Sequence, residues 1–228
     1  MSLRLDFMVR RADFTLRVDT TIDAGRTVAV IGTNGAGKTT LLESIAGLVA
    51  VDEGRIVVDD RVLDSVDDDT FVAPERRDIG VMFQDYLLFD HLSMLENVAF
   101  GPRARGVRKA EARERAREMI ASVGLSHLVD RRPPELSGGQ RQRAALLRAL
   151  ATHPRVLLLD EPLAAIDSAA RAELRASLVE RIDEFDGITL VVTHDAPDVT
   201  AMAERVIVLD SGNVVWDGPV TDDGWRSR

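Results

Sequence analysis

The chain has 228 residues, of which 45% are hydrophobic and 29% charged, a formal net charge of −9 and no cysteine. This length predicts one large domain or a core with an inserted lobe, and the absence of cysteine excludes disulfides and thiolate metal sites. The acidic balance argues against nucleic acid as the main partner, and no secretory leader or apolar run of roughly 20 residues, the length that spans a bilayer, is visible.

The first part of the chain predicts strands, with one helix directly after a glycine-rich loop. Residues 38–48 predict that helix, because leucine and isoleucine recur at helical spacing. Residues 64–69 are acidic, and we expect a solvated loop there. Alternating or continuous apolar runs predict strands at residues 3–9, 14–22, 27–31, 55–58 and 79–83, the first two antiparallel.

Helical character dominates the middle of the chain. Residues 108–122 are rich in Ala, Arg and Glu, which are strong helix formers. After a further helix at 168–185, strands alternate with helices again, which indicates an α/β core with a largely parallel sheet, interrupted by a helical insertion. These later strands are predicted at residues 156–159, 188–192, 206–209 and 214–216.

A glycine-rich loop between a predicted strand and a predicted helix fits the phosphate-binding pattern G-x-x-x-x-G-K-[ST]. Such a loop turns its N–H groups toward one anion, and the helix adds its positive N-terminal end. Lys38 is expected to reach the β- and γ-phosphates, Thr39 to bind Mg²⁺ through its hydroxyl and Thr40 to help hold the phosphate. The loop consists of Gly32, Thr33, Asn34, Gly35, Ala36, Gly37, Lys38 and Thr39.

Two adjacent carboxylates follow the buried strand predicted at 156–159. Ligands of parallel α/β sheets bind beyond the carboxyl ends of the strands, so both groups are expected at the site. We expect Asp160 to hold Mg²⁺ and Glu161 to act as general base or polariser for the attacking water. By itself, a strand that ends in Asp and Glu is as often structural as catalytic. Together with the phosphate loop, the catalytic interpretation is favoured.

A second glycine-rich segment, Leu136 followed by Ser137, Gly138, Gly139 and Gln140, opens another predicted helix. Ser137 is expected to be its N-cap, and the two glycines leave the helix N-terminus open to a phosphate. Gln84 and His194 each follow a predicted strand. We expect Gln84 to reach Mg²⁺ and the attacking water, and His194 to contact the γ-phosphate.

Taken in chain order, these motifs resemble the nucleotide-binding subunit of ATP-binding cassette (ABC) transporters, over nearly the whole chain. Residues 32–39 match the Walker A motif, 156–161 Walker B, 136–140 the family signature and 163–167 the D-loop. Gln84 matches the Q-loop and His194 the switch histidine. The resemblance implies a P-loop core with an N-terminal antiparallel β subdomain (1–90 and 152–228) and an inserted helical signature subdomain (91–151).

The family resemblance also implies the partners. Two copies would form a homodimer with ATP and Mg²⁺ between the Walker A motif of one chain and the signature of the other. Residues 84–92 look like the importer form, which implies membrane permease subunits, a solute-binding protein and a peripheral place on the cytoplasmic face of the membrane. Residues 97–102 and 170–175 look most like molybdate and sulfate importer ATPases.

Several alternatives stay open from the sequence. Polyamine, thiamine and ferric-iron importer ATPases are close to the same pattern, and a non-transport ABC ATPase is the second hypothesis. The chain stops soon after Trp216, so we expect no C-terminal regulatory domain. The residue that stacks on adenine is undecided between Phe7, Phe14 and the arginines Arg10 and Arg11.

Overall fold

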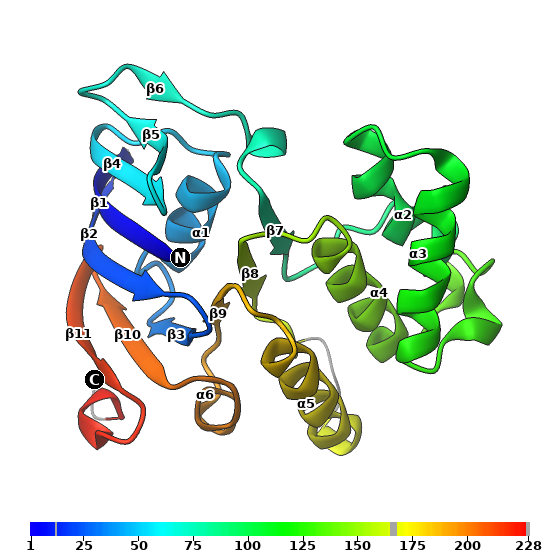
Figure 1. Cartoon of the computed structure of the whole chain (residues 1–228). Helices are drawn as coiled ribbons and strands as arrows, with labels where there is room; N and C mark the ends of the chain where they lie inside the picture. The colour runs from blue at the N-terminus through cyan, green and yellow to red at the C-terminus, as the bar shows by residue number, and fades with distance from the viewer. Residues whose placement is uncertain (12, 165–167, 227–228) are drawn as a thin grey trace.

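The computed structural model describes residues 1–11, 13–164 and 168–226, and its strands form one 11-stranded sheet in those residues (Figure 1). The strand order is β6-β5-β4-β1-β2-β11-β10-β3-β9-β8-β7. The strands are β1 (Ser2–Arg11), β2 (Phe14–Asp23), β3 (Thr27–Gly32), β4 (Glu53–Val58), β5 (Arg61–Ser65), β6 (Thr70–Phe71), β7 (Ile79–Met82), β8 (Val156–Asp160), β9 (Ile188–Val192), β10 (Arg205–Asp210) and β11 (Asn213–Pro219). The helices are α1 (Lys38–Ala46), α2 (Met94–Ala104), α3 (Lys109–Ser122), α4 (Gly138–Leu150), α5 (Ser168–Asp183) and α6 (Ala196–Met202).

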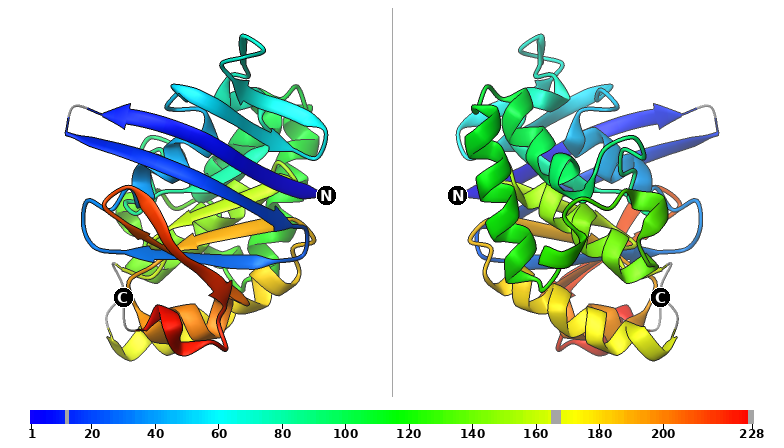
Figure 2. Two further views of the ribbon diagram at one scale, coloured as in Figure 1. Left: turned by 90° about the vertical axis from the view of Figure 1, so that its left-hand side faces the viewer. Right: turned by 90° about the vertical axis from the view of Figure 1, so that its right-hand side faces the viewer.

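The sheet has a parallel part and an antiparallel part. Strands β10, β3, β9, β8 and β7 are parallel neighbours, and β8 and β9 are buried along their whole length. Strands β1 and β2 pair antiparallel, as their alternating sequences predict, and lie side by side in Figure 2. The prediction of a largely parallel sheet is therefore confirmed for the core strands, whereas the whole sheet is mixed.

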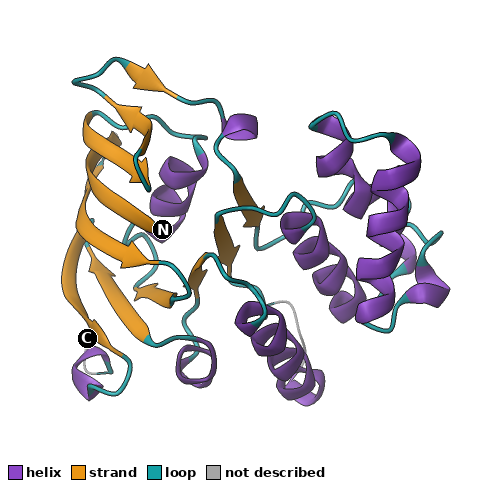
Figure 3. Ribbon diagram, in the orientation of Figure 1, coloured by secondary structure: helices purple, strands orange, loops and turns teal. Residues whose placement is uncertain are grey.

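Helices α2, α3 and α4 lie together on one side of the molecule, beyond the edge strand β7 (Figures 1 and 3). They share a hydrophobic cluster of their own, to which α2 contributes Val98, α3 Ile120 and α4 Leu147. Charged side chains of α3 pair with one another, for example Arg115 with Glu111, and Arg113 pairs with Glu96 of α2. The helical insertion predicted from the sequence thus has its own core, while its boundaries at 91 and 151 stay a prediction.

Helix α1 is shorter than its sequence pattern predicts. It ends at Ala46 because Gly47 adopts a left-handed conformation with φ 84°, and Leu48 lies outside it with 54% of its surface exposed. Such a glycine C-cap stops a helix since the chain can turn away there without steric cost. Strand β7 likewise ends at Met82, one residue before the predicted end.

The acidic stretch 64–69 is the clearest wrong expectation. Asp64 and Ser65 belong to β5 and are buried, whereas residues 66–69 are exposed as predicted. The carboxylate of Asp64 accepts a hydrogen bond of 3.1 Å from the guanidinium of Arg77, which is also buried. Arg77 further donates to the carbonyls of Ser44 and Ile45 in the last turn of α1. Arg77 thus adds a donor to carbonyls at the end of α1, where the helix itself supplies few partners.

Candidate functional site

The loop of residues 32–39 joins β3 to α1 at the carboxyl edge of the parallel strands (Figure 1). The Nζ atom of Lys38 donates to the carbonyls of Gly32 and Thr33 at 2.8 and 2.9 Å, so its ammonium group lies within the curve of the loop. Helix α1 begins after Gly37 without a side-chain cap. Its first N–H groups and the lysine therefore form a positive environment suited to phosphate.

Gly37 is required at its position for two reasons. Its φ of 106° lies in the left-handed region, and an added Cβ atom would stand 2.8 Å from the Cζ atom of Phe14. Phe14 at the start of β2 thus packs against the phosphate loop, whereas Phe7 is buried in the core of the sheet. Of these two phenylalanines, Phe14 is the one that borders the loop.

The two predicted carboxylates lie at the end of β8. Asp160 is its last residue and is buried; Glu161 follows with a φ of 44°, in the left-handed region. The N–H of Glu161 donates to the carbonyl of Val192 at the end of β9, at 2.9 Å. A non-glycine residue in this conformation is strained, and the neighbouring strand holds it there.

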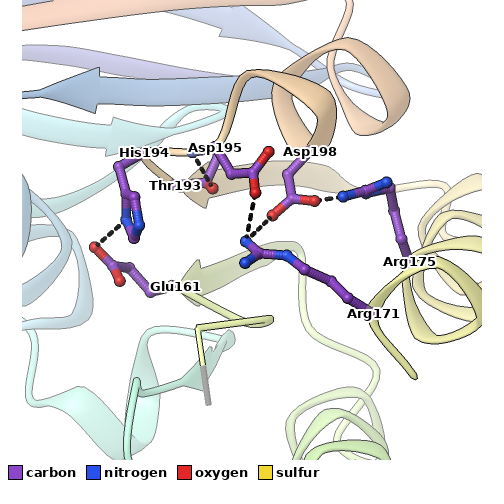
Figure 4. Close-up of polar contacts among 7 residues, drawn as sticks. All are labelled: Glu161, Arg171, Arg175, Thr193, His194, Asp195 and Asp198. Atoms are coloured by element: carbon purple, nitrogen blue, oxygen red, sulfur yellow. Dashed lines mark hydrogen bonds and ion pairs between the residues drawn. The ribbon is translucent and has the colours of Figure 1, made fainter. Parts of the chain in front are cut away.

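The side chain of Glu161 points toward His194, which follows β9 (Figure 4). The Nδ1 atom of His194 lies 3.1 Å from Oε1 of Glu161, and the imidazole is 63% exposed. Two segments that are 33 residues apart in the sequence thus place a carboxylate and an imidazole side by side. The structure brings together the expected general base and the expected phosphate-contacting histidine.

The pKa of the Asp160 carboxyl group is raised by its surroundings. Burial, with a further contribution from Glu161, raises the pKa of Asp160 from 3.8 to about 6, and the ammonium of Lys38 opposes this rise. A bound cation beside the carboxylate would stabilise its charged form and thereby lower the pKa of Asp160 again. The described residues contain no group of three or more His, Cys, Asp or Glu side chains that could hold a metal by themselves. Mg²⁺ fits such a site, because it is usually held by one or two carboxylates, waters and substrate phosphates.

Gln84 lies in the turn after β7 and is exposed. Because β7 and β8 are parallel and Met82 pairs with Leu159, Gln84 lies beyond the same edge of the sheet as Glu161, which follows β8. Its side chain makes no hydrogen bond within the described residues, so the structure brings it to the correct edge of the sheet without joining it to the carboxylates. Of the apolar residues that follow, Tyr86 is buried and Leu87 is 55% exposed, while the rings of Phe89 and Phe100 lie 4.6 Å apart.

The segment 136–140 opens α4 as predicted. Ser137 is the N-cap, its hydroxyl accepts the N–H of Gln140, and the Gln140 side chain accepts the N–H of Ser137 in return. This capping box satisfies two N–H groups at the start of the helix. The segment stands on the helical insertion, away from the loop between β3 and α1 (Figure 1). Within the described residues, no hydrogen bond joins the two glycine-rich segments of one chain.

Sequence reasoning missed the ion pairs that surround His194. Arg171 on α5 pairs with Asp195 and Asp198, and Arg175 pairs with Asp198 (Figure 4). The arginines are four residues apart on a helix and the aspartates three apart at a helix start, so each pair shares a face. That spacing indicates that the two residues of each pair lie on one helix face, but it does not indicate which distant residues this face contacts. The predicted D-loop residues 165–167 lie outside the described part of the chain.

Fold and site together define an ATP-binding cassette. A family model described as "ABC transporter" matches residues 16–164, and the chain therefore belongs to the ABC transporter family. The chain is similar to an ATP-binding cassette, MJ0796, solved as a dimer in a post-hydrolysis state with ADP and Pi. The likeness has a TM-score of 0.80 and 30% identity, and covers 96% of this chain and 99% of that one.

Two curated relatives have a higher sequence identity to this chain. The chain is 45% identical to the molybdenum import ATP-binding protein ModC of Mycobacterium tuberculosis, over 92% of this chain and 58% of that protein. It is 44% identical to the sulfate/thiosulfate import ATP-binding protein CysA of Nocardia farcinica, over 92% of this chain and 62% of that protein. The chain thus spans about three fifths of the length of these relatives. In the described residues, no helix has the length and apolar character needed to cross a membrane.

Proposed function

We propose that this chain is the ATP-binding and ATP-hydrolysing subunit of an ABC importer. The observation that carries the proposal is the convergence of Lys38, Asp160, Glu161 and His194 at the carboxyl edge of adjacent parallel strands, around one phosphate loop. Each of these groups has a role in phosphoryl transfer, for which catalysis is mostly positioning and charge stabilisation.

ATP binding rests on the loop and the start of α1. The N–H groups of residues 32–40 and the ammonium of Lys38 hold the β- and γ-phosphates, with the hydroxyl of Thr40 as a further contact. Asp160, Thr39 and Gln84 are the residues that would hold Mg²⁺. When bound, Mg²⁺ would neutralise part of the phosphate charge.

Hydrolysis depends on Glu161 and His194. Glu161 accepts a proton from the attacking water, and its hydrogen-bond contact with His194 keeps the carboxylate oriented toward the γ-phosphate. His194 contacts the γ-phosphate itself. Because the imidazole is largely exposed, it is free to meet a ligand that enters from outside the chain.

The complete site is proposed to contain two copies of the chain. Ser137, Gly138, Gly139 and Gln140 of one copy face the γ-phosphate held by the other, and supply N–H donors and a helix end. The separation of the two glycine-rich segments within one chain supports this arrangement, as does the dimeric state of the similar cassette. The γ-phosphate then favours the closed dimer and its loss releases it, which is a ligand-driven switch.

The closed dimer would drive transport through membrane permease subunits that hold the chain at the cytoplasmic face. The exposed side chain of Leu87, three residues after Gln84, offers a contact for such a subunit. A solute-binding protein would deliver the cargo, and the similarity to molybdenum and sulfate import proteins favours molybdate or another oxyanion. Polyamine, thiamine or ferric iron are the alternative cargoes.

The test of nucleotide chemistry uses the two lysines of the chain, Lys38 and Lys109. Lys38→Ala should lose ATP binding and turnover, whereas Lys109→Ala, on the exposed face of α3, should keep both. Binding of a fluorescent ATP analogue and phosphate release are the measurements. Normal ATP affinity in Lys38→Ala would refute the phosphate-loop assignment.

A second experiment separates transport from other uses of the cassette. The tagged chain is purified from membranes of its native host, and its ATP turnover is followed as molybdate, sulfate, ferric iron or spermidine is supplied with the matching binding protein. Co-purification of an integral membrane protein and stimulation by an oxyanion support the importer. Failure to retain any membrane protein would favour an ABC ATPase outside transport.

A further inference from the structure

The segment that carries His194 is tied to helix α5 by charged side chains. The guanidinium of Arg171 lies 3.0 Å from Asp195 and 2.7 Å from Asp198, and thereby bridges the two carboxylates (Figure 4). Arg175, one turn later on α5, reaches Asp198 at 2.5 Å. Asp198 is 1% exposed, so its charge depends on these two partners.

At the start of α6, the side chain of Asp195 pairs with Arg171 on the neighbouring helix α5. Asp195 is the N-cap of α6, yet its side chain makes no capping hydrogen bond. An N-cap aspartate ordinarily accepts an N–H from the first turn of its own helix. In α6, Pro197 has no N–H to donate and the N–H of Asp198 goes to the backbone carbonyl of Asp195. The Asp195 carboxylate is thus left to pair with Arg171, a residue outside α6.

His194 is therefore held between two fixed neighbours. On one side, β9 ends at Val192 in the middle of the parallel sheet; on the other, Asp195 is bound to Arg171. The hydroxyl of Thr193 accepts the N–H of Asp195 at 3.2 Å, which closes the short segment between them. A shift of Asp195 would move the imidazole relative to Glu161.

The two arginines differ in what they reach. The hydrogen bond to Asp198 raises the pKa of Arg171, and the charges of Asp195 and Glu161 add to this effect. The field of the Arg171 guanidinium thus extends to the carboxylate of the proposed general base. Arg175 pairs with Asp198 without an ion pair to Asp195 in the described residues, which makes it a matched control on the same helix.

We infer that Arg171 is a positioning residue for ATP hydrolysis: by bridging Asp195 and Asp198 it holds His194 beside Glu161. This inference rests on the proposed function. A simpler role, in which both arginines only fasten α6 to α5, makes a different prediction, because it treats Arg171 and Arg175 alike and expects no dependence on His194.

The test compares Arg171→Met with Arg175→Met in the purified chain, by steady-state ATP hydrolysis and thermal unfolding. Loss of Arg171 should lower kcat by about 10- to 100-fold with KM changed less than about twofold, since misplacement of a reacting group affects the chemical step. Arg175→Met should lower kcat by less than about threefold at a comparable Tm. Arg171→Lys, which keeps the charge but not the fork geometry, should recover only part of kcat.

A double-mutant cycle with His194→Ala decides whether Arg171 acts through the histidine. In the His194→Ala background, Arg171→Met should change kcat by less than about twofold, because the group that it positions is gone. An unchanged kcat in Arg171→Met, or the same fold-loss with and without His194, would overturn the inference. Should Arg171→Met not fold, Asp195→Asn breaks the same contact and is expected to show the same pattern.

The outcomes also separate this inference from the proposed function. A wild-type chain that hydrolyses ATP in a Lys38-dependent manner, with kcat unaffected by Arg171→Met, refutes the role of Arg171 alone. A wild-type chain without Lys38-dependent turnover refutes the proposed function, and the role of Arg171 with it.

Discussion

Two clusters of arginine and aspartate in this molecule use the same chemical groups for different purposes. Arg77 and Asp64 pair where β5 meets the end of α1, with side chains 0% and 4% exposed. Arg171, Asp195 and Asp198 pair beside the proposed reaction site, where the side chains of Arg171 and Asp195 are 21% and 23% exposed and that of Asp198 is 2% exposed. The first cluster joins elements of the core, whereas the second joins a helix to the segment that carries His194.

The degree of burial determines how much each cluster contributes to the stability of the fold. A buried ion pair has lost its hydration, so removing one partner leaves an unpaired charge and costs stability. A partly exposed pair such as Arg171 with Asp195 retains water as an alternative partner and contributes little to stability. Asp198 is buried, but it has two arginine partners, so replacing Arg171 leaves it paired with Arg175. We therefore expect the Arg77 cluster to affect the folding equilibrium and the Arg171 cluster to affect the geometry of the reaction. Three further experiments test this contrast.

The largest effect is expected next to the Arg171 cluster. Glu161→Gln removes the proposed base and should lower kcat by about 10²–10⁴-fold, the range for loss of a general base. ATP binding should persist and the dimer should stay closed, because the amide keeps the shape of the side chain. Phosphate release and size-exclusion chromatography with ATP are the measurements. Glu184→Gln, at an exposed glutamate, is the matched control, and unchanged turnover in Glu161→Gln would refute the role of Glu161.

Breaking the buried cluster should have the opposite signature. Arg77→Met leaves the Asp64 carboxylate buried without its ion-pair partner and removes the side-chain donor to the carbonyls of Ser44 and Ile45. We therefore expect a loss of about 3–5 kcal/mol in the free energy of unfolding. In the fraction that stays folded, kcat should change little. Urea unfolding measures the first quantity, and Arg76→Met, at the exposed neighbour, serves as control.

The outcome that contradicts this assignment is a folded Arg77→Met protein with normal stability. The double variant Arg77→Met with Asp64→Leu sharpens the test, because it removes both charges. It should recover part of the lost stability, since no unpaired carboxylate remains in the interior.

Asp160 stands between the two cases, because it is buried and also part of the site. Its pKa in the folded protein is about 6, above its ordinary value of 3.8, so the folded state binds the proton more tightly than the unfolded state. The stability that this group contributes is present below pH 4 and is lost as pH rises to 6. Asp160→Asn should therefore stabilise the protein by up to about 3 kcal/mol at pH 8.

The gain from Asp160→Asn should shrink as the pH falls from 6 toward 4, because the wild-type carboxyl becomes neutral there. Urea unfolding of both proteins across this pH range is the measurement. A gain of equal size at every pH would show that the effect has another origin than the charge of Asp160.

Much of the fold follows from local sequence. The alternation in β1 and β2 and the apolar runs of β3, β8 and β9 predict their strands, because each pattern reports which faces are buried. The acidic run was misread for a physical reason. Charge runs are ordinarily solvated, and only the meeting of β5 with Arg77, 13 residues away, turns Asp64 inward.

The phosphate loop, the paired carboxylates after β8 and the N-cap of α4 can be predicted from the amino-acid sequence, since each is made by residues next to one another in the chain. The tertiary structure alone decided that Glu161 meets His194 and that Arg171 bridges Asp195 and Asp198. Such contacts depend on strand order and on which helix face packs where. Those choices are made by the burial of the whole core, and a short stretch of sequence does not contain them.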